Sequence, residues 1–236
     1  DARTALQWLA SLPQGAARRT LALRIKLKAS RHAHQTQDAL DTARLLGKHR
    51  AFSAAAAQSI VRGLAMELID GAHDPAQLQQ VWQSLENSER AMPELAVHAA
   101  QRLASLGGER ALVRHWLLPA WQQMVDNPGA LAGHHALKLV RALEAGLDAL
   151  DAPWLARIET AAQANPRDAR LQYLAGMACL QRQLWGKAQQ LLTQSTQQLQ
   201  DASLRRSAWQ RLAELAEQRG DGHAAAQAWK SAALAD

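Results

Sequence analysis

The chain contains 236 residues, 48% of them hydrophobic, and this composition excludes a disordered tail. Aromatic residues make up only 4%, and Ala and Leu supply most apolar side chains, so helices are favoured over strands. The single cysteine, Cys179, excludes a disulfide framework and a cysteine-based zinc cluster. No apolar run approaches the ~20 residues that a membrane span needs. This portion is therefore expected to be soluble, and its start at Asp1 indicates a piece of a longer protein.

Positive charge gathers at the beginning of the chain. The formal net charge is +6, but the first 50 residues hold ten Lys and Arg residues against three acids. The remaining residues hold 17 basic and 18 acidic side chains, so they are nearly neutral. A basic block beside a neutral remainder argues against a general nucleic-acid coat, and it predicts one local contact with an anionic partner.

Turn residues divide the chain into segments whose apolar residues recur at three- and four-residue spacing, the pattern of paired amphipathic helices. The first such unit, near residues 20–50, is faint. Its small and apolar repeat positions are Leu23, Leu27, Ala39 and Ala43. Residues 51–91 predict a hairpin without a repeat signature. Within it, Asp74 before Pro75 predicts a helix N-cap followed by proline in the first turn.

A second faint unit lies near residues 92–125. Its corresponding positions hold Leu95, Ala99, Gly107 and Ala111. Residues 129–166 predict another hairpin without the signature. There Asp151, two residues before Pro153, predicts a second N-cap with proline in the first turn.

The final unit, 206–236, has the most specific pattern. Bulky residues stand at repeat positions 4, 7 and 24 (Trp209, Leu212 and Trp229). Small residues stand at positions 8, 20 and 27 (Ala213, Ala225 and Ala232), and the turn glycine at position 15 is Gly220. This is the pattern of the tetratricopeptide repeat, in which small residues mark the close contact between helices A and B. The unit 169–202 matches less fully, with Gly176 and Ala188 at two small positions. It starts 37 residues earlier, close to the repeat length of about 34 residues.

These units together predict an all-α fold, an α-solenoid of stacked helical hairpins in a right-handed superhelix. About four to six hairpins are expected, with the clearest repeats at 169–202 and 206–236. The units follow one another without a long linker. The expected organisation is therefore a single repeat array over residues 1–236.

Three runs resemble the HemY-type tetratricopeptide-repeat proteins, a bacterial family associated with heme biosynthesis. They are Pro-Arg-Asp-Ala-Arg-Leu-Gln-Tyr-Leu-Ala-Gly-Met (166–177), Leu-Trp-Gly-Lys-Ala-Gln-Gln-Leu-Leu-Thr-Gln-Ser (184–195) and Trp-Gln-Arg-Leu-Ala-Glu-Leu-Ala-Glu-Gln-Arg-Gly (209–220). The resemblance spans most of the chain, although its motifs are largely general repeat motifs. It implies the soluble repeat portion of an inner-membrane protein, on the cytoplasmic face, with membrane association through an N-terminal part outside this sequence.

In tetratricopeptide folds, helix A positions 2, 5, 9, 12 and 13 line the concave groove. In the unit at residue 20 these are Leu21, Arg24, Lys28, Arg31 and His32, a mainly basic set. In the unit at 169 they are Arg170, Tyr173, Met177, Leu180 and Gln181, and in the last unit they are Ser207, Gln210, Glu214, Glu217 and Gln218. A groove that runs from basic to acidic would orient an extended peptide or a helix with complementary ends.

Seven of these residues are the candidate partner-binding residues: Arg24, Lys28, Arg31, His32, Arg170, Tyr173 and Met177. The alternative is that their charges form only the solvated face of amphipathic helices. The eight tryptophans are spread along the chain, and they are expected to pack between helices. Cys179 is expected in the core.

No nucleotide-binding, metalloprotease or nucleophile-elbow motif occurs, so no catalytic site and no enzyme activity are expected. The histidines show no ligand spacing, because His32 and His34 would point to different sides of a helix. No metal site is therefore predicted, and the histidines are expected at helix surfaces and ends.

Two main functions remain open. The first is a non-catalytic scaffold that binds other proteins, which the resemblance implies to be enzymes of late heme (protoheme IX) biosynthesis. The alternative is a carrier or sensor that binds heme or a porphyrin in the groove, with a groove arginine or lysine pairing with propionates and a histidine ligating iron. A third possibility is contact of the basic block with a membrane surface. Nucleic acid is not expected as a partner, because no aromatic residues interleave with the basic ones.

Overall fold

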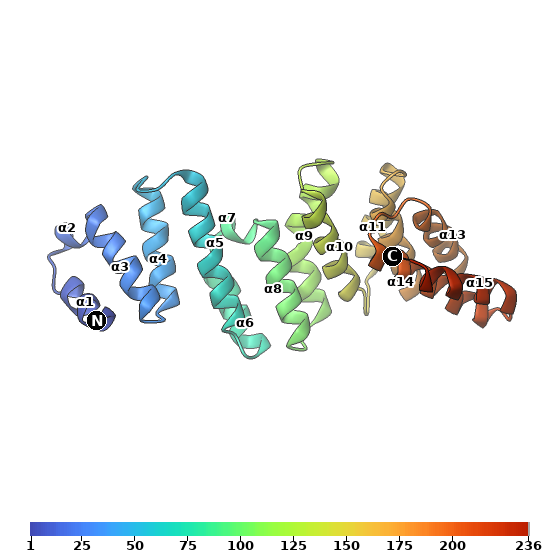
Figure 1. The fold of residues 1–236 in the computed structure, drawn as a ribbon, viewed down its shortest axis with the longest axis horizontal. Helices are drawn as coiled ribbons and strands as arrows, with labels where there is room; N and C mark the ends of the chain where they lie inside the picture. The colour runs from blue at the N-terminus through green and yellow to red at the C-terminus, as the bar shows by residue number, and fades with distance from the viewer. Residues whose placement is uncertain (236) are drawn as a thin grey trace. The chain divides into compact units, whose positions relative to one another are not determined.

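The computed structural model describes residues 1–235 of the chain. This part contains fifteen helices and no strand, with neighbouring helices packed in series (Figure 1), so the all-α prediction is confirmed. Contacts divide the chain into two compact units, Asp1–Gly107 and the chain from Gly108 onward. The boundary falls inside the faint repeat expected near residues 92–125. That repeat therefore contributes one helix to each unit.

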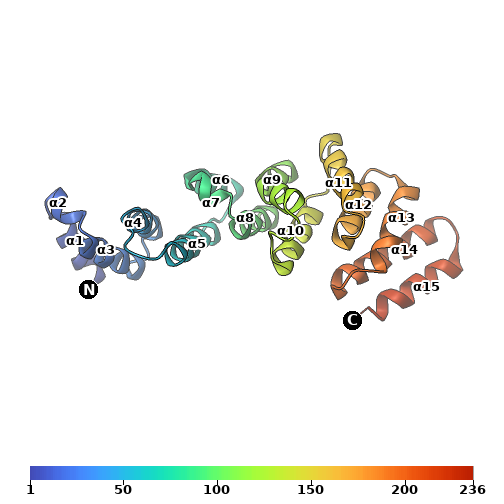
Figure 2. The ribbon, with the colours of Figure 1, turned by 90° about the horizontal axis from the view of Figure 1, so that it is seen from above.

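The first unit contains eight helices. They are α1 (Ala2–Ala10), α2 (Gln14–Ala17), α3 (Thr20–His32), α4 (Thr36–Lys48), α5 (Ala54–Asp70), α6 (Pro75–Ser84), α7 (Asn87–Arg90) and α8 (Pro93–Ser105). Helices α3, α4 and α5 pack side by side in chain order (Figure 2), and α5 also packs against α8. The helix pair α3 and α4 corresponds to the faint repeat expected near residues 20–50.

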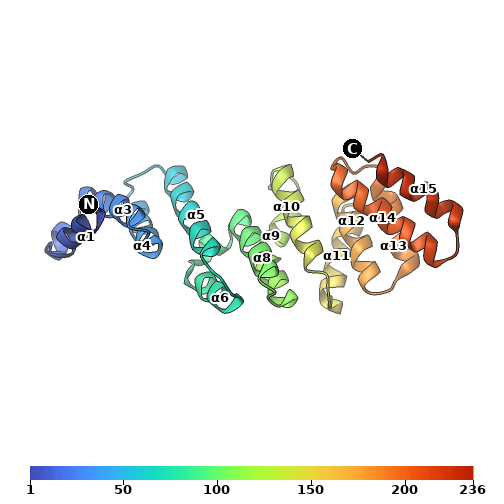
Figure 3. The ribbon, with the colours of Figure 1, turned by 60° about the horizontal axis from the view of Figure 1, so that its bottom comes forward.

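The second unit contains seven helices. They are α9 (Arg110–Asp126), α10 (Gly133–Ala145), α11 (Ala152–Ala164), α12 (Ala169–Gln181), α13 (Trp185–Thr196), α14 (Ala202–Gln218) and α15 (Gly222–Ala233). Two hairpins, α12 with α13 and α14 with α15, have the most extensive helix contacts in the chain (Figure 3). Their helices coincide with the two clearest sequence repeats.

Gly176 shows why these hairpins need small residues. A Cβ atom at this position would lie 2.7 Å from Cγ of Leu192 and 3.2 Å from its backbone nitrogen. Helices α12 and α13 therefore approach more closely than a larger residue would allow. In the last hairpin, the matching Ala213 and Ala225 are both buried, and Gly220 in the turn has a φ of 76°, where glycine carries no steric penalty.

Helix N-caps follow the expected chemistry. Asp74 accepts a hydrogen bond from the backbone N–H of Gln77, and Asp151 accepts one from Trp154, both at 2.8 Å. Each cap is followed by proline in the first turn. These bonds satisfy donors that the first helical turn leaves free, and both predicted caps are confirmed.

Arginine side chains bind backbone carbonyls at the ends of other helices. Arg102 donates to the Ala72 carbonyl at 2.8 Å, and Arg114 donates to the Gly146 carbonyl at 2.5 Å. Arg182 donates to the Leu150 carbonyl at 3.1 Å. Gly146 caps the C-terminus of α10 and Ala72 follows that of α5, where carbonyls lack partners inside the helix, so these arginines supply donors. Leu150 lies in the loop before α11. The three arginines tie the connections that follow α5 and α10 to neighbouring helices.

The core consists mainly of leucine and alanine, and Cys179 is fully buried in it, as expected. Four tryptophans are buried between helices: Trp82, Trp116, Trp121 and Trp154. The prediction that tryptophans pack between helices is wrong for Trp8, which is 73% exposed, since α1 is short and covers little surface. Trp185 and Trp229 are also exposed, at 41% and 39%.

Candidate functional site

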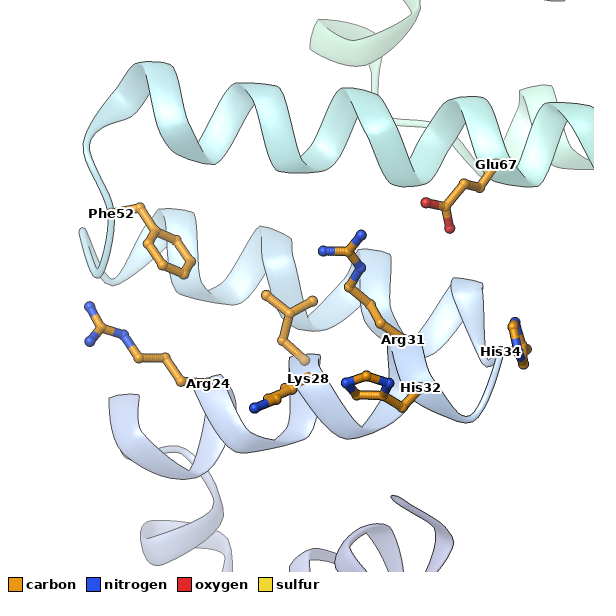
Figure 4. A pocket seen from close by; sticks show the side chains of 8 residues that line it. Arg24, Lys28, Arg31, His32, His34, Phe52 and Glu67 are labelled. Atoms are coloured by element: carbon orange, nitrogen blue, oxygen red, sulfur yellow. The ribbon is translucent and has the colours of Figure 1, made fainter. Parts of the chain in front are cut away.

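A basic hollow in the first unit lies between α3 and α5, beside the turn that joins α4 to α5. Its volume is about 820 Å³. It is lined by Arg24, Leu27, Lys28, Arg31, His32, His34, Phe52 and Glu67 (Figure 4). We call this hollow the basic cavity. Four of the seven candidate residues from the sequence meet here: Arg24, Lys28, Arg31 and His32.

The helical repeat explains why these four side chains meet. Helix α3 packs its Leu23 and Leu27 against the rest of the unit. Arg24, Lys28 and Arg31 follow at spacings of four and three residues, so they share one face of the helix beside Leu27. Leu27 also lines the cavity and is only 8% exposed, so it forms an apolar part of the cavity wall.

Arg24 is fixed in position by two contacts. Its Nη2 donates a hydrogen bond to the carbonyl oxygen of Ala51 at 2.7 Å. Its guanidinium carbon also lies 5.4 Å from the centre of the Phe52 ring, within the range of a cation–π contact. Figure 4 shows the two side chains at the same end of the cavity. The guanidinium is held in place with donors still unused, and so it can bind an anion with little loss of side-chain entropy.

Lys28 and Arg31 form no ion pair with any residue of the described chain. The one acidic residue that lines the cavity is Glu67 on α5. Arg31 and Glu67 extend into the same space from opposite helices (Figure 4), but they do not form an ion pair. Two arginines and one lysine therefore line the cavity with a single carboxylate, and the cavity has an excess of positive charge that is open to solvent.

His32 and His34 both line this cavity, but their rings lie apart in it (Figure 4), so the expectation that they would point to different sides is not contradicted. That expectation assumed one continuous helix. Helix α3 ends at His32, and His34 follows in the turn with a positive φ of 56°. The chain therefore leaves the helical path before His34, and the two imidazoles border one hollow from a helix end and a turn.

The other candidate residues lie on α12 in the second unit, and the structure does not gather them into one site. Arg170 is paired with Asp168, with Nη2 to Oδ2 at 2.9 Å. Its side chain borders a hollow at the start of α12. Met177, 6% exposed, borders a separate small pocket with Trp185.

Tyr173 corrects the groove prediction most clearly, because its side chain is fully buried. Its hydroxyl donates a hydrogen bond to Oε1 of Glu144 on α10 at 2.7 Å. Burial, followed by the nearby Glu144 charge, raises the pKa of Tyr173 far above its ordinary value. Neighbouring helices cover the residue, so it stabilises the packing of α12 and does not present a surface to a partner.

Two of the acidic residues expected at the end of the groove already have partners within the chain. Glu214 forms an ion pair with Arg211 at 2.8 Å, and Glu217 accepts a hydrogen bond from Nε1 of Trp229 at 2.7 Å. Contacts with neighbouring groups thus reduce the free acidic surface of α14. The basic cavity is the more distinct charged site.

The sequence did not indicate Phe52 or Glu67 as cavity residues. Both belong to segments beyond the helix A positions used for the groove prediction. Phe52 is the only phenylalanine of the chain and follows a turn, which was an available signal. Glu67 had no distinguishing signal, because its role depends on how α5 packs.

Among residues 1–235, no group of three or more His, Cys, Asp or Glu side chains is placed to hold a metal ion. In the same range, every helix is too short or too polar to cross a membrane.

Comparison with known proteins assigns the chain to no family. No protein-family model matches the chain, and no curated protein matches it.

Proposed function

We propose that this chain is a non-catalytic scaffold that binds an acidic segment of a partner protein in the basic cavity. The observation that supports this proposal is the charge of the cavity. Arg24, Lys28 and Arg31 line it together, and Glu67 is the single carboxylate among the lining residues. Complementary charge steers partners toward such a surface and selects among them.

The arrangement favours carboxylates over other anions on the partner. Arg24 presents a planar guanidinium that can bind a carboxylate with two parallel hydrogen bonds. Lys28 supplies a mobile ammonium group on the same helix face. Leu27 and Phe52 offer apolar surface beside the cations. A segment with Asp or Glu next to an apolar side chain would satisfy both parts of the cavity.

The size of the cavity also fits a peptide segment. Its volume of about 820 Å³ lies within the range of roughly 300 to 1,000 Å³ that is usual for small-molecule sites, so it can hold a few side chains of a longer segment. It is open along α3. An extended or helical segment can therefore lie along the helix with several side chains in contact.

The partners that we propose are enzymes of late heme biosynthesis. This part of the proposal rests on the resemblance to HemY-type tetratricopeptide-repeat proteins alone. On the same resemblance we propose that the full-length protein is held in the bacterial inner membrane by an N-terminal part, with this portion on the cytoplasmic face.

The charge of the cavity can be tested with a fluorescein-labelled peptide of repeated Glu-Glu-Leu units, with its affinity measured by anisotropy. A triple variant, Arg24→Glu, Lys28→Glu and Arg31→Glu, should bind it about 100-fold more weakly or worse, because several charge-assisted hydrogen bonds are lost. A control reverses three exposed cations outside the cavity: Arg3→Glu, Arg19→Glu and Lys138→Glu. The control has the same net charge. Equal loss in both variants would contradict a local site.

Heme or porphyrin binding is the second candidate, and one observation favours it. His32 and His34 line the same hollow as the three cations, so an iron ligand and partners for propionates are close together. A hemin titration followed by absorbance tests it. A saturable Soret shift that is lost in His32→Ala and His34→Ala would support a carrier. If the intact chain shows no Soret shift but still binds the acidic peptide, the result would favour the scaffold function over the carrier.

A further inference from the structure

A second cavity in the first unit lies among α1, α2, α3 and α4, and its lining is mainly aliphatic. Its volume is about 390 Å³. Five leucines line it: Leu6, Leu9, Leu12, Leu23 and Leu45. The remaining lining consists of alanines, one glutamine and two basic residues. We call it the aliphatic cavity.

Its lining selects against flat and aromatic ligands. No aromatic and no acidic side chain is found among its described lining residues. Aromatic ligands are usually held by aromatic side chains that stack on them, and none is present to do so. Aliphatic side chains match a flexible hydrocarbon chain by shape and by the hydrophobic effect.

The helices that form the cavity leave this surface uncovered. Neither α1 nor α2 contains a fully buried residue. Leu12 is 39% exposed, and Leu45 is 42% exposed. Isolated exposed leucines are ordinary, but these two line the same cavity as three further leucines. The apolar surface is therefore continuous and hollow.

Two cations border the aliphatic lining, Arg18 after α2 and Lys26 on α3. Neither forms an ion pair with a residue of the part that the structure describes. A ligand with an apolar tail and a negative head would therefore complete the cavity. Its tail would cover the leucines, and its head would pair with Arg18 and Lys26.

We propose that the aliphatic cavity binds the hydrocarbon chain of an anionic amphiphile, with its carboxylate or phosphate head at Arg18 and Lys26. The volume of the cavity agrees with one hydrocarbon chain. At about 30 Å³ for a group the size of a water molecule, the cavity holds roughly 13 such groups, a number comparable to the carbons of one acyl chain. Free fatty acids and anionic phospholipids share this chemistry.

The site is independent of the proposed scaffold function. Lys26 and Leu23 face the aliphatic cavity, whereas Arg24, Lys28 and Arg31 face the basic cavity on another side of α3. Reversal of the three basic-cavity charges should therefore leave lipid binding intact. Failure of one proposal does not affect the other.

The test uses a dansyl-labelled undecanoic acid, whose fluorescence rises when it enters an apolar site, with palmitate as competitor. Saturable binding at one probe per chain and displacement by palmitate are expected. Hexadecyltrimethylammonium has the same chain with a positive head, and it should compete about tenfold less well or worse, because it is repelled by Arg18 and Lys26. Vesicles of phosphatidylglycerol, compared with phosphatidylcholine, show whether a phospholipid in a bilayer is also bound.

Two double variants test where in the cavity the ligand binds. Leu12→Asp with Leu45→Asp puts charges on exposed lining positions, so folding should be retained while the probe is lost. Arg18→Glu with Lys26→Glu should weaken palmitate about tenfold or more, whereas Arg19→Glu, next in sequence but outside the lining, should not. Absence of probe binding, or binding unchanged in both lining variants, would overturn the proposal. So would a dimer of the chain that Leu12→Asp dissociates, because a second copy would then cover the cavity.

Discussion

Arg44 holds Glu89 with two hydrogen bonds, from Nε to Oε1 at 2.8 Å and from Nη2 to Oε2 at 2.6 Å. The side chain of Glu89 is only 3% exposed, and that of Arg44 is 13% exposed. The same carboxylate accepts the backbone N–H of Glu86 at 2.8 Å, which completes the capping box of α7. One buried ion pair therefore joins α4 to α7 and also begins a helix.

Removal of one partner should destabilise the first unit strongly. Glu89→Ala removes the buried partner of Arg44 and leaves only its exposed partner, Asp41, at 2.8 Å. Loss of one member of a buried ion pair typically costs about 3 to 5 kcal/mol in free energy of unfolding. The control is Lys48→Ala, which breaks the exposed contact of Lys48 with Glu86 at 3.5 Å. Its cost should stay below about 1 kcal/mol. Urea unfolding measures both, and equal costs would show that the buried pair is unimportant.

Gly176 gives a second stability prediction. A methyl group at this position meets Leu192, so Gly176→Ala should destabilise the α12–α13 hairpin by about 1 to 3 kcal/mol. A Cβ atom at Gly186 in α13 would meet nothing outside its own helix within 4 Å. Gly186→Ala should therefore stabilise the chain by up to about 1 kcal/mol through helix propensity. Thermal unfolding compares the two, and the same sign for both would contradict the close helix contact.

Arg114 should contribute more to the free energy of unfolding than Arg110 on the same helix. Its Nη1 donates to the carbonyls of Gly146 and Asp148, and its side chain is 3% exposed. Arg114→Met removes these donors and should cost about 2 to 4 kcal/mol. Arg110→Met changes a partly exposed side chain 3.6 Å from Asp148, and it should cost below about 1 kcal/mol. Chemical unfolding of both variants checks this difference.

Stability should fall in alkaline solution because of Cys179. Burial, with a smaller effect of the nearby Glu159, raises the pKa of its thiol to about 12. The unfolded thiol ionises near pH 8.5, so the stability contribution is complete below that pH and is lost as the pH rises toward about 12. Cys179→Ala should reduce this loss. An identical pH dependence in the variant, or rapid thiol labelling of the folded chain at pH 8, would contradict the assignment.

Local sequence signals predicted much of the fold. Asp74 and Asp151 defined helix starts because an aspartate before a proline-containing first turn satisfies free backbone donors. The small residues Gly176 and Ala213 located the two hairpins of the second unit. The division into two compact units was not predicted, since the sequence near Gly107 resembles an ordinary turn between repeat helices.

The candidate site was predicted only in part. The basic face of α3 follows directly from helical spacing, so Arg24, Lys28 and Arg31 were found. Tyr173 was misplaced, because a helix position does not reveal which neighbouring helix covers it, and Glu144 of α10 binds its hydroxyl. Phe52 was missed because its contact with Arg24 joins residues 28 positions apart. Such contacts depend on the packing between helices.

A charge exchange tests the central claim most directly. The triple variant Arg24→Glu, Lys28→Glu and Arg31→Glu should lose the Glu-Glu-Leu peptide and gain affinity for the matching Lys-Lys-Leu peptide, with both affinities measured by anisotropy. Exchange of preference at unchanged folding would show that an anionic segment binds in the basic cavity. If the intact chain binds neither peptide, or if the variant keeps its preference for the acidic peptide, the basic cavity is not the partner site.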